Sequence, residues 1–155
     1  MPEPAWPDYQ LHFGLRARIT KLKWTLAPLT IYLGLDTKVK GMYHHNYFLR
    51  RNFEEYAHKI FKNSIKLDEP YYYVNIQSMH NPGYAPPGKE SVFILCPVPD
   101  LRYKTNWDDA ESIADAIVQD MSERTGFDFV THTEVCRRNY GHLFRARPGD
   151  HFQRV

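Results

Sequence analysis

Histidine and cysteine are the residues of this chain that could ligate a metal or carry out covalent chemistry. His44 and His45 are adjacent, and imidazole is a common nitrogen ligand for zinc. They fall in a segment with the composition of a strand, where neighbouring side chains point to opposite faces. We therefore expect the two rings to diverge, one packed inward and one exposed, which favours ordinary packing over a metal site.

The remaining candidates for such chemistry also lack the spacing that a site needs. His132, Cys136 and His142 come without a C-x-x-C pair or an H-x-x-x-H spacing. Cys96 stands among apolar residues with no base nearby in sequence, so we expect a small core residue and not a nucleophile. The chain also has no G-x-G-x-x-G, P-loop, G-x-S-x-G or H-E-x-x-H motif. The sequence therefore predicts no catalytic residue and no metal site.

A set of eight aromatic residues is suited to binding and not to reaction. Pockets for long apolar ligands are lined by aliphatic and aromatic side chains, but the cores of sheets use the same residues. Both interpretations remain open for Tyr32, Tyr43, Tyr47, Phe48, Tyr71, Tyr72, Tyr73 and Phe93.

Strands are the elements that must position most of these residues. Runs of β-branched, aromatic and apolar residues between polar or Pro/Gly-rich connections predict four of them. The last run is almost continuously apolar, which is typical of a strand buried on both faces. The four expected strands span residues 29–35, 42–49, 71–77 and 91–98.

Two amphipathic helices are expected beside these strands. Asn52 with Glu55 three residues later resembles a capping box, and it predicts a helix over 52–62. A second helix is expected over 107–124, capped by Asn106 and closed by Gly126. Its apolar face comprises Ala110, Ile113, Ala114, Ile117 and Met121. The fold class that we predict is α+β, a mostly antiparallel sheet of about four strands with two amphipathic helices.

Length and composition indicate one domain with chemically distinct ends. The 155 residues suffice for one core, and two cysteines make no disulfide framework, so a reducing, intracellular setting is expected. The start has no secretory signal pattern, and no apolar run is long enough to span a bilayer. The net charge is +2, but residues 136–155 hold five Arg against one Asp. We assign 1–17 to an irregular lead-in and 131–155 to a basic tail, disordered or non-native, without the signature of a nucleic-acid-binding module.

The segments between these ends resemble a known family. Residues 21–36, with the letters Y-L-G-L-D, are followed by H-H-N within 43–49 and by an acidic helix. Together with later segments in the same order, they resemble the phytoene desaturase and carotenoid dehydrogenase family. The later segments are 70–76, 85–90, 92–99 and 106–109, and the resemblance extends over about 18–129.

The resemblance implies an FAD-dependent oxidoreductase that introduces double bonds into a long polyene. The family binds FAD through glycine-rich segments near both ends, and this sequence contains neither. Residues 18–130 would then be a fragment of the substrate domain, inactive alone and without FAD of its own. Truncation or an altered reading frame would explain the two ends.

The same resemblance implies which residues contact the polyene and where the protein acts. The candidate polyene contacts are Tyr32, Gly34, Tyr43 and Phe93. We expect a cytoplasmic protein with peripheral membrane contact, binding no nucleic acid and no metal. The alternative is a non-enzymatic module that binds an apolar ligand or a partner protein.

Overall fold

The computed structural model describes residues 26–61, 69–99, 108–140 and 153–154. It confirms the α+β class and the antiparallel sheet. The helices are α2 (Phe53–Phe61) and α3 (Ala110–Thr125), and two 3₁₀ turns, η1 (Gln77–Met79) and η2 (Pro82–Tyr84), follow the third strand. The strands are β1 (Ala27–Leu35), β2 (His45–Phe48), β3 (Tyr72–Ile76), β4 (Glu90–Val98), β5 (Thr133–Tyr140) and β6 (Gln153–Arg154).

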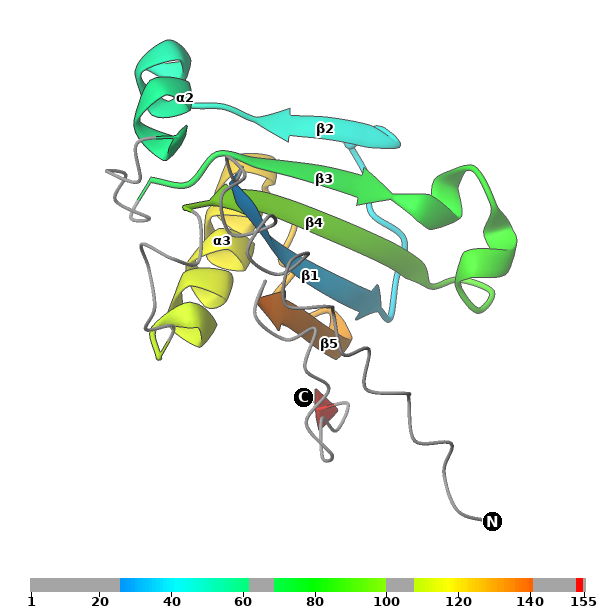
Figure 1. Cartoon of the computed structure of the whole chain (residues 1–155). Coiled ribbons are helices and arrows are strands. Elements are labelled where there is room, and N and C mark those ends of the chain that lie inside the picture. The colour runs from blue at the N-terminus through cyan, green and yellow to red at the C-terminus, as the bar shows by residue number, and fades with distance from the viewer. Residues whose placement is uncertain (1–25, 62–68, 100–107, 141–152, 155) are drawn as a thin grey trace, which may run out of the picture.

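All strand pairs of the sheet are antiparallel. The order is β2-β3-β4-β1-β5-β6, so β1 lies between its partners β4 and β5 (Figure 1). The ladder between β1 and β4 runs without a break from Ala27 opposite Val98 to Leu35 opposite Glu90. A register shift after Gly34 interrupts the ladder between β1 and β5.

The core lies between the sheet and α3. Alternate residues of β1, namely Leu29, Ile31, Leu33 and Leu35, are at most 3% exposed, and they pack in one cluster with the apolar face of the helix. Period-two alternation is what a strand shows when one face of its sheet is covered. Figure 1 shows α3 lying across that face.

The prediction that 91–98 is buried on both faces is wrong. The structure instead alternates along β4, with Val92, Ile94, Cys96 and Val98 buried and the residues between them only partly covered. The reason is that α3 packs on one face only. The continuous apolar run therefore places apolar side chains on a second, more open face as well.

The predicted apolar face of α3 is confirmed, but its predicted start is not. Ala110, Ile113, Ala114, Ile117 and Met121 are all buried, and the helix begins at Ala110. Gly126 ends it with a left-handed φ of 73°, and its N–H donates to the Ser122 carbonyl at 2.9 Å. Glycine adopts this conformation without the cost that a Cβ imposes. Asn106, the expected cap, lies outside the described residues.

Helix α2 packs at one end of the sheet. The ring of Tyr56 lies 4.0 Å from that of Tyr71, and its hydroxyl donates to the Pro97 carbonyl at 3.1 Å. Ile60 is buried, whereas most of the helix is exposed, which fits the amphipathic pattern. The carbonyl of Asn52 accepts the first helical hydrogen bond, from Tyr56.

Strand β5 corrects the expected basic tail, because residues 133–140 are part of the sheet. They pair with β1 along most of its length. The charge that made this segment look foreign is neutralised locally, since the Arg138 guanidinium pairs with Glu111 and Asp115 of α3. The lead-in 1–17 and the tail over 141–152 lie outside the described residues.

Candidate functional site

Four aromatic side chains form a continuous row across the sheet face opposite α3. We call Tyr32, Phe93, Tyr73 and Tyr47, from β1, β4, β3 and β2, the aromatic row, and the face that carries it the open face. The ring centroids of Tyr32 and Phe93 are 5.2 Å apart, those of Phe93 and Tyr73 6.5 Å, and those of Tyr73 and Tyr47 5.2 Å. These separations are typical of aromatic contacts. The row is therefore a connected surface and not a scatter of exposed rings.

The register of the sheet explains how these rings come together. Phe93 stands opposite Tyr32 on one side and Asn75 on the other, and Asn75 stands opposite His45. Side chains of directly opposed residues share a face and lie about 5 Å apart. In the neighbouring position Tyr73 stands opposite Tyr47. The row thus follows from pairing alone, once each strand has the correct face inward.

The row is accessible on the described surface. Tyr32 is 40% exposed and Tyr47 is 71% exposed. Thr30, Ser91 and Leu95, which lie beside the row on this face, are uncharged, and Arg137 of β5 stands opposite Tyr32 at its outer end. Contiguous apolar surface of this kind marks binding sites for apolar ligands or partners.

Three of the four residues predicted to contact a polyene lie together on the open face. Tyr32, Gly34 and Phe93 share it, and a Cβ at position 34 would approach the Cβ of Val135 to 3.4 Å. Gly34 therefore leaves a shallow depression in the open face beside Tyr32, which any larger side chain would fill. Tyr43 is 80% exposed, lies before β2, and makes no described ring contact with the row.

The structure divides the eight-residue aromatic set between core and surface. Phe48 and Tyr72 stack on each other at 4.7 Å and are buried, and Tyr71 is buried against Tyr56. Tyr47 and Tyr73, which the polyene prediction omitted, complete the row. The signal that could have found them is strand alternation, because Tyr72 and Tyr73 must face opposite sides once Val74 is placed in the core.

A histidine cluster adjoins the β2 end of the row. The prediction that His44 and His45 diverge is wrong, since their ring centroids lie 4.2 Å apart, and His80 stacks on His44 at 4.2 Å. The reason is that β2 begins at His45. His44 therefore lies in a bend where strand alternation does not apply.

Hydrogen bonds hold this cluster against β3. The Nδ1 of His44 donates to the Ile76 carbonyl at 2.9 Å, and the hydroxyl of Tyr73 lies 2.6 Å from Nδ1 of His45. Asn75, only 8% exposed, donates to the His44 carbonyl at 3.1 Å. Among the described residues, no group of three or more His, Cys, Asp or Glu side chains is placed to hold a metal ion.

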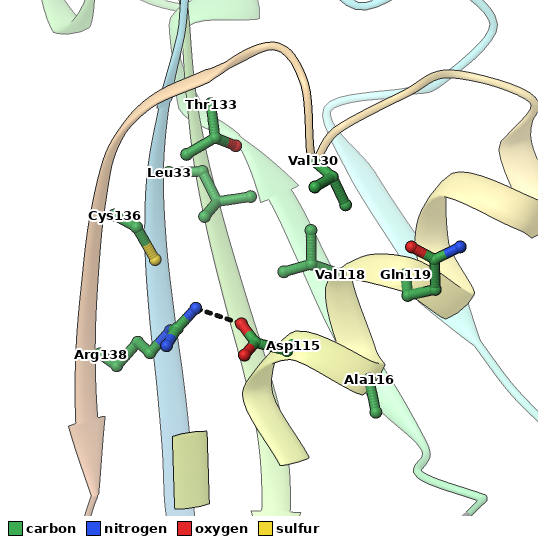
Figure 2. Close-up of a pocket in the computed structure, with 9 residues that line it drawn as sticks. All are labelled: Leu33, Asp115, Ala116, Val118, Gln119, Val130, Thr133, Cys136 and Arg138. Atoms are coloured by element: carbon green, nitrogen blue, oxygen red, sulfur yellow. Dashed lines mark hydrogen bonds and ion pairs between the residues drawn. The ribbon is translucent and has the colours of Figure 1, made fainter. Parts of the chain in front are cut away.

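A pocket of about 390 Å³ lies on the other side of the sheet, between α3, β1 and β5 (Figure 2). Leu33, Val118 and Val130 give it apolar walls, and Arg138 reaches across it to the carboxylate of Asp115. The remaining lining residues are Ala116, Gln119, Thr133, Cys136 and Asp115.

The chemistry of this pocket does not support catalysis. Burial and the nearby Asp115 carboxylate raise the pKa of the Cys136 thiol, which disfavours the nucleophilic thiolate. Cys96, fully buried as predicted, has its pKa raised by burial to about 12. The raised pKa disfavours the thiolate form of both cysteines, and the open face is the stronger candidate site.

No described helix is both long and apolar enough to cross a bilayer.

Comparison with known proteins finds several phytoene desaturases among the relatives of this chain. The chain is 34% identical over 128 residues to a phytoene desaturase of Phycomyces blakesleeanus, an alignment of 76% of this chain and 22% of that protein. It is 40% identical over 75 residues to a phytoene desaturase of Cercospora nicotianae, covering 48% of this chain and 12% of the relative. A zeta-carotene-forming phytoene desaturase of Myxococcus xanthus is 29% identical over 90 residues, an alignment that covers 58% of this chain and 17% of that protein.

The chain spans at most about a quarter of the length of these curated relatives. No family model matches the sequence.

Proposed function

Because the chain is homologous to part of the phytoene desaturases, we propose that it holds a long apolar polyene on its open face, against the aromatic row. The single observation that carries this proposal is the row itself, four rings in contact across four strands with two of them well exposed. This is the substrate-holding role of a desaturase, without its redox step.

The dimensions and chemistry of the row suit such a ligand. Neighbouring strands lie about 4.8 Å apart, so the three steps from β1 to β2 extend about 14 Å. Flat aromatic faces in contact with a flat conjugated chain bury apolar area without leaving polar groups unpaired. Gly34 keeps the surface low beside Tyr32, which gives the chain a path past the ring.

FAD, the cofactor of the family, does not fit the residues that the structure describes. A dinucleotide site of the usual kind needs a glycine-rich turn between a parallel strand and a helix. The sequence has no such motif, and the pairs of the described sheet are antiparallel. We therefore propose that this chain binds polyene without desaturating it, and that the electron acceptor, where there is one, is bound outside the described residues.

The test is retention of phytoene, the polyene in the names of the relatives. The purified chain is mixed with phytoene in detergent micelles, separated by gel filtration, and the extracted phytoene is quantified in the protein fractions. A flavin absorbance spectrum is recorded on the same fractions. We expect phytoene at the protein peak and no stoichiometric flavin.

Matched variants locate the binding surface. Each ring that covers about 40 Å² of ligand contributes about 1 kcal/mol at 25 cal/mol per Å². Tyr32→Ser combined with Phe93→Ser should then weaken retention roughly thirtyfold. Tyr84→Ser is the control, because Tyr84 is 62% exposed but lies in η2, away from the row.

Two results would overturn the proposal. One is a double variant that retains as much phytoene as the native chain. The other is a native chain that retains no more than the micelles alone. Stoichiometric FAD in the purified chain would refute the separate statement about the cofactor.

A further inference from the structure

Strand β2 forms one edge of the sheet, and half of its backbone groups point away from the sheet (Figure 1). The N–H of Ile76 donates to the His44 carbonyl at 3.0 Å, which fixes the hydrogen-bond pattern between β2 and β3. In an antiparallel ladder, residues whose backbone points to the partner strand alternate with residues whose backbone points away. The N–H and C=O groups of His45 and Tyr47 therefore point outward, and no described residue bonds them.

Two copies of this edge are complementary to each other. When two copies run antiparallel with Asn46 of each on a two-fold axis, His45 of one copy stands opposite Tyr47 of the other. The outward groups of these two residues then exchange hydrogen bonds in both pairs. Opposed residues share a face of a sheet, and His45 and Tyr47 both lie on the open face, so the open faces of the two copies join. A two-fold contact of this kind uses the same surface on both copies and closes at a dimer.

The composition of β2 favours such a contact. Natural sheets guard their exposed edges with lysine, proline or bulges, and a two-fold axis would bring any charge close to its own copy. Strand β2 contains no Asp, Glu, Lys, Arg or Pro, whereas β6 at the opposite edge carries Arg154. Large apolar side chains are exposed along β2, Tyr47 at 71% within the strand and Tyr43 at 80% and Leu49 at 47% beside its two ends. The same register places Tyr43 of one copy next to Leu49 of the other, so the contact covers both.

We infer that two copies of this chain associate edge to edge through β2 and form one continuous antiparallel sheet. Their aromatic rows then meet at Tyr47 and become a single surface. Three strand steps in each copy and one between them, at about 4.8 Å each, extend this surface to about 34 Å, against about 14 Å for one row. The association does not depend on the proposed function, but a long polyene lying on the joined rows would contact both copies.

Sedimentation equilibrium of the purified full chain, without ligand or detergent, measures the association. Because the contact is small, we expect a reversible dimer, whose apparent mass rises from 18.4 kDa toward twice that value as the protein concentration increases. Tyr47→Lys places a charge near its own copy at the axis, so this variant should keep the mass of a single chain. Tyr84→Lys is the matched control, because Tyr84 is 62% exposed but lies in η2, and it should dimerise as the native chain does.

A cysteine at position 46 tests the register of the contact. Asn46 of one copy faces Asn46 of the other in a pair without hydrogen bonds, where Cα atoms lie about 4.5 Å apart. A disulfide can span this separation. Asn46→Cys should therefore form a cross-linked dimer with oxidised glutathione, seen on a non-reducing gel, whereas Tyr84→Cys should not. The native chain, with Cys96 and Cys136, gives the background of the assay.

Three results would overturn the inference. The first is a native chain that keeps the mass of a single chain at every concentration, or whose mass continues to rise past that of a dimer. The second is a Tyr47→Lys variant that dimerises as strongly as the native chain. The third is an Asn46→Cys variant that cross-links no more than Tyr84→Cys. Polyene retention is measured separately, so none of these results bears on the proposed function.

Discussion

Replacing Glu90 tests how much one buried carboxylate contributes to the stability of the sheet. Its carboxylate side chain is 2% exposed at the start of β4. One oxygen accepts from the Ser78 hydroxyl at 2.5 Å and from the Lys38 ammonium at 3.0 Å, and the other accepts from the Val39 N–H at 3.2 Å. This single side chain joins β4, η1 and the connection that leads from β1 to β2.

The cost of removing the carboxylate can be worked from these contacts. Glu90→Ala leaves two buried donors unpaired, the Ser78 hydroxyl and the Val39 N–H, while Lys38 is half exposed and regains water. An unpaired buried donor costs about 1–3 kcal/mol. We therefore expect the free energy of unfolding to fall by about 3 kcal/mol.

Urea denaturation followed by circular dichroism measures this change. With a slope of about 2 kcal/mol per M, the midpoint should fall by about 1.5 M. Glu134→Ala is the matched control, because Glu134 also pairs with a lysine, Lys89, but both side chains are at least one-third exposed. Such a pair contributes at most about 1 kcal/mol.

A fall in unfolding free energy of less than about 1 kcal/mol in Glu90→Ala, or no larger than that of the Glu134→Ala control, would contradict this expectation. Either result would mean that water replaces the carboxylate and that its burial is not what binds the three segments.

Three further predictions concern single residues. Gly126→Ala should lose about 1 kcal/mol of unfolding free energy, since φ is +73° and a Cβ there meets no atom within 4 Å; an unchanged urea midpoint would contradict this. Burial and the hydrogen bond from its hydroxyl to Asp120 raise the pKa of Tyr72 above its usual value, so stability should fall as the pH rises past the unfolded phenol's pKa of about 10. The free energy of unfolding of the Tyr72→Phe variant should fall less steeply than that of the native chain between about pH 9 and about pH 11. Equal losses of stability in the two proteins over this range would refute the assignment to Tyr72. Because burial raises the pKa of the Cys96 thiol to about 12, a thiol reagent at about pH 8 should modify Cys96 only after unfolding, and rapid labelling of Cys96 in the native chain would contradict its burial.

Local patterns in the sequence were enough to predict most elements. The apolar period of 3.6 placed the buried face of α3, from Ala110 to Met121, and Gly126 marked its end. The β-rich runs located β1, β3 and β4 to within two residues at each end. The order of motifs indicated the family, which the relatives now support. These features depend on near neighbours in the chain, which is why they can be read from it.

The candidate site depended on information that local patterns do not carry. Three consecutive tyrosines, Tyr71 to Tyr73, have equal β-propensity. Strand alternation puts Tyr72 and Tyr73 on opposite faces, and the position of α3 decides that the face of Tyr72 is the covered one. The contact of His44 with His45 depended likewise on where β2 begins, which pairing with β3 sets.

Strand β5 shows most directly what tertiary structure adds. By itself, the segment around Arg137 and Arg138 has the charge of a solvated tail. In the fold, β1 supplies a free edge for its backbone, and carboxylates of α3 neutralise Arg138. The sequence by itself determined most of the elements and indicated the family, because these features are local. The pairing of strands distant in sequence decided which face of the sheet is covered. It therefore also decided which rings meet on the open face.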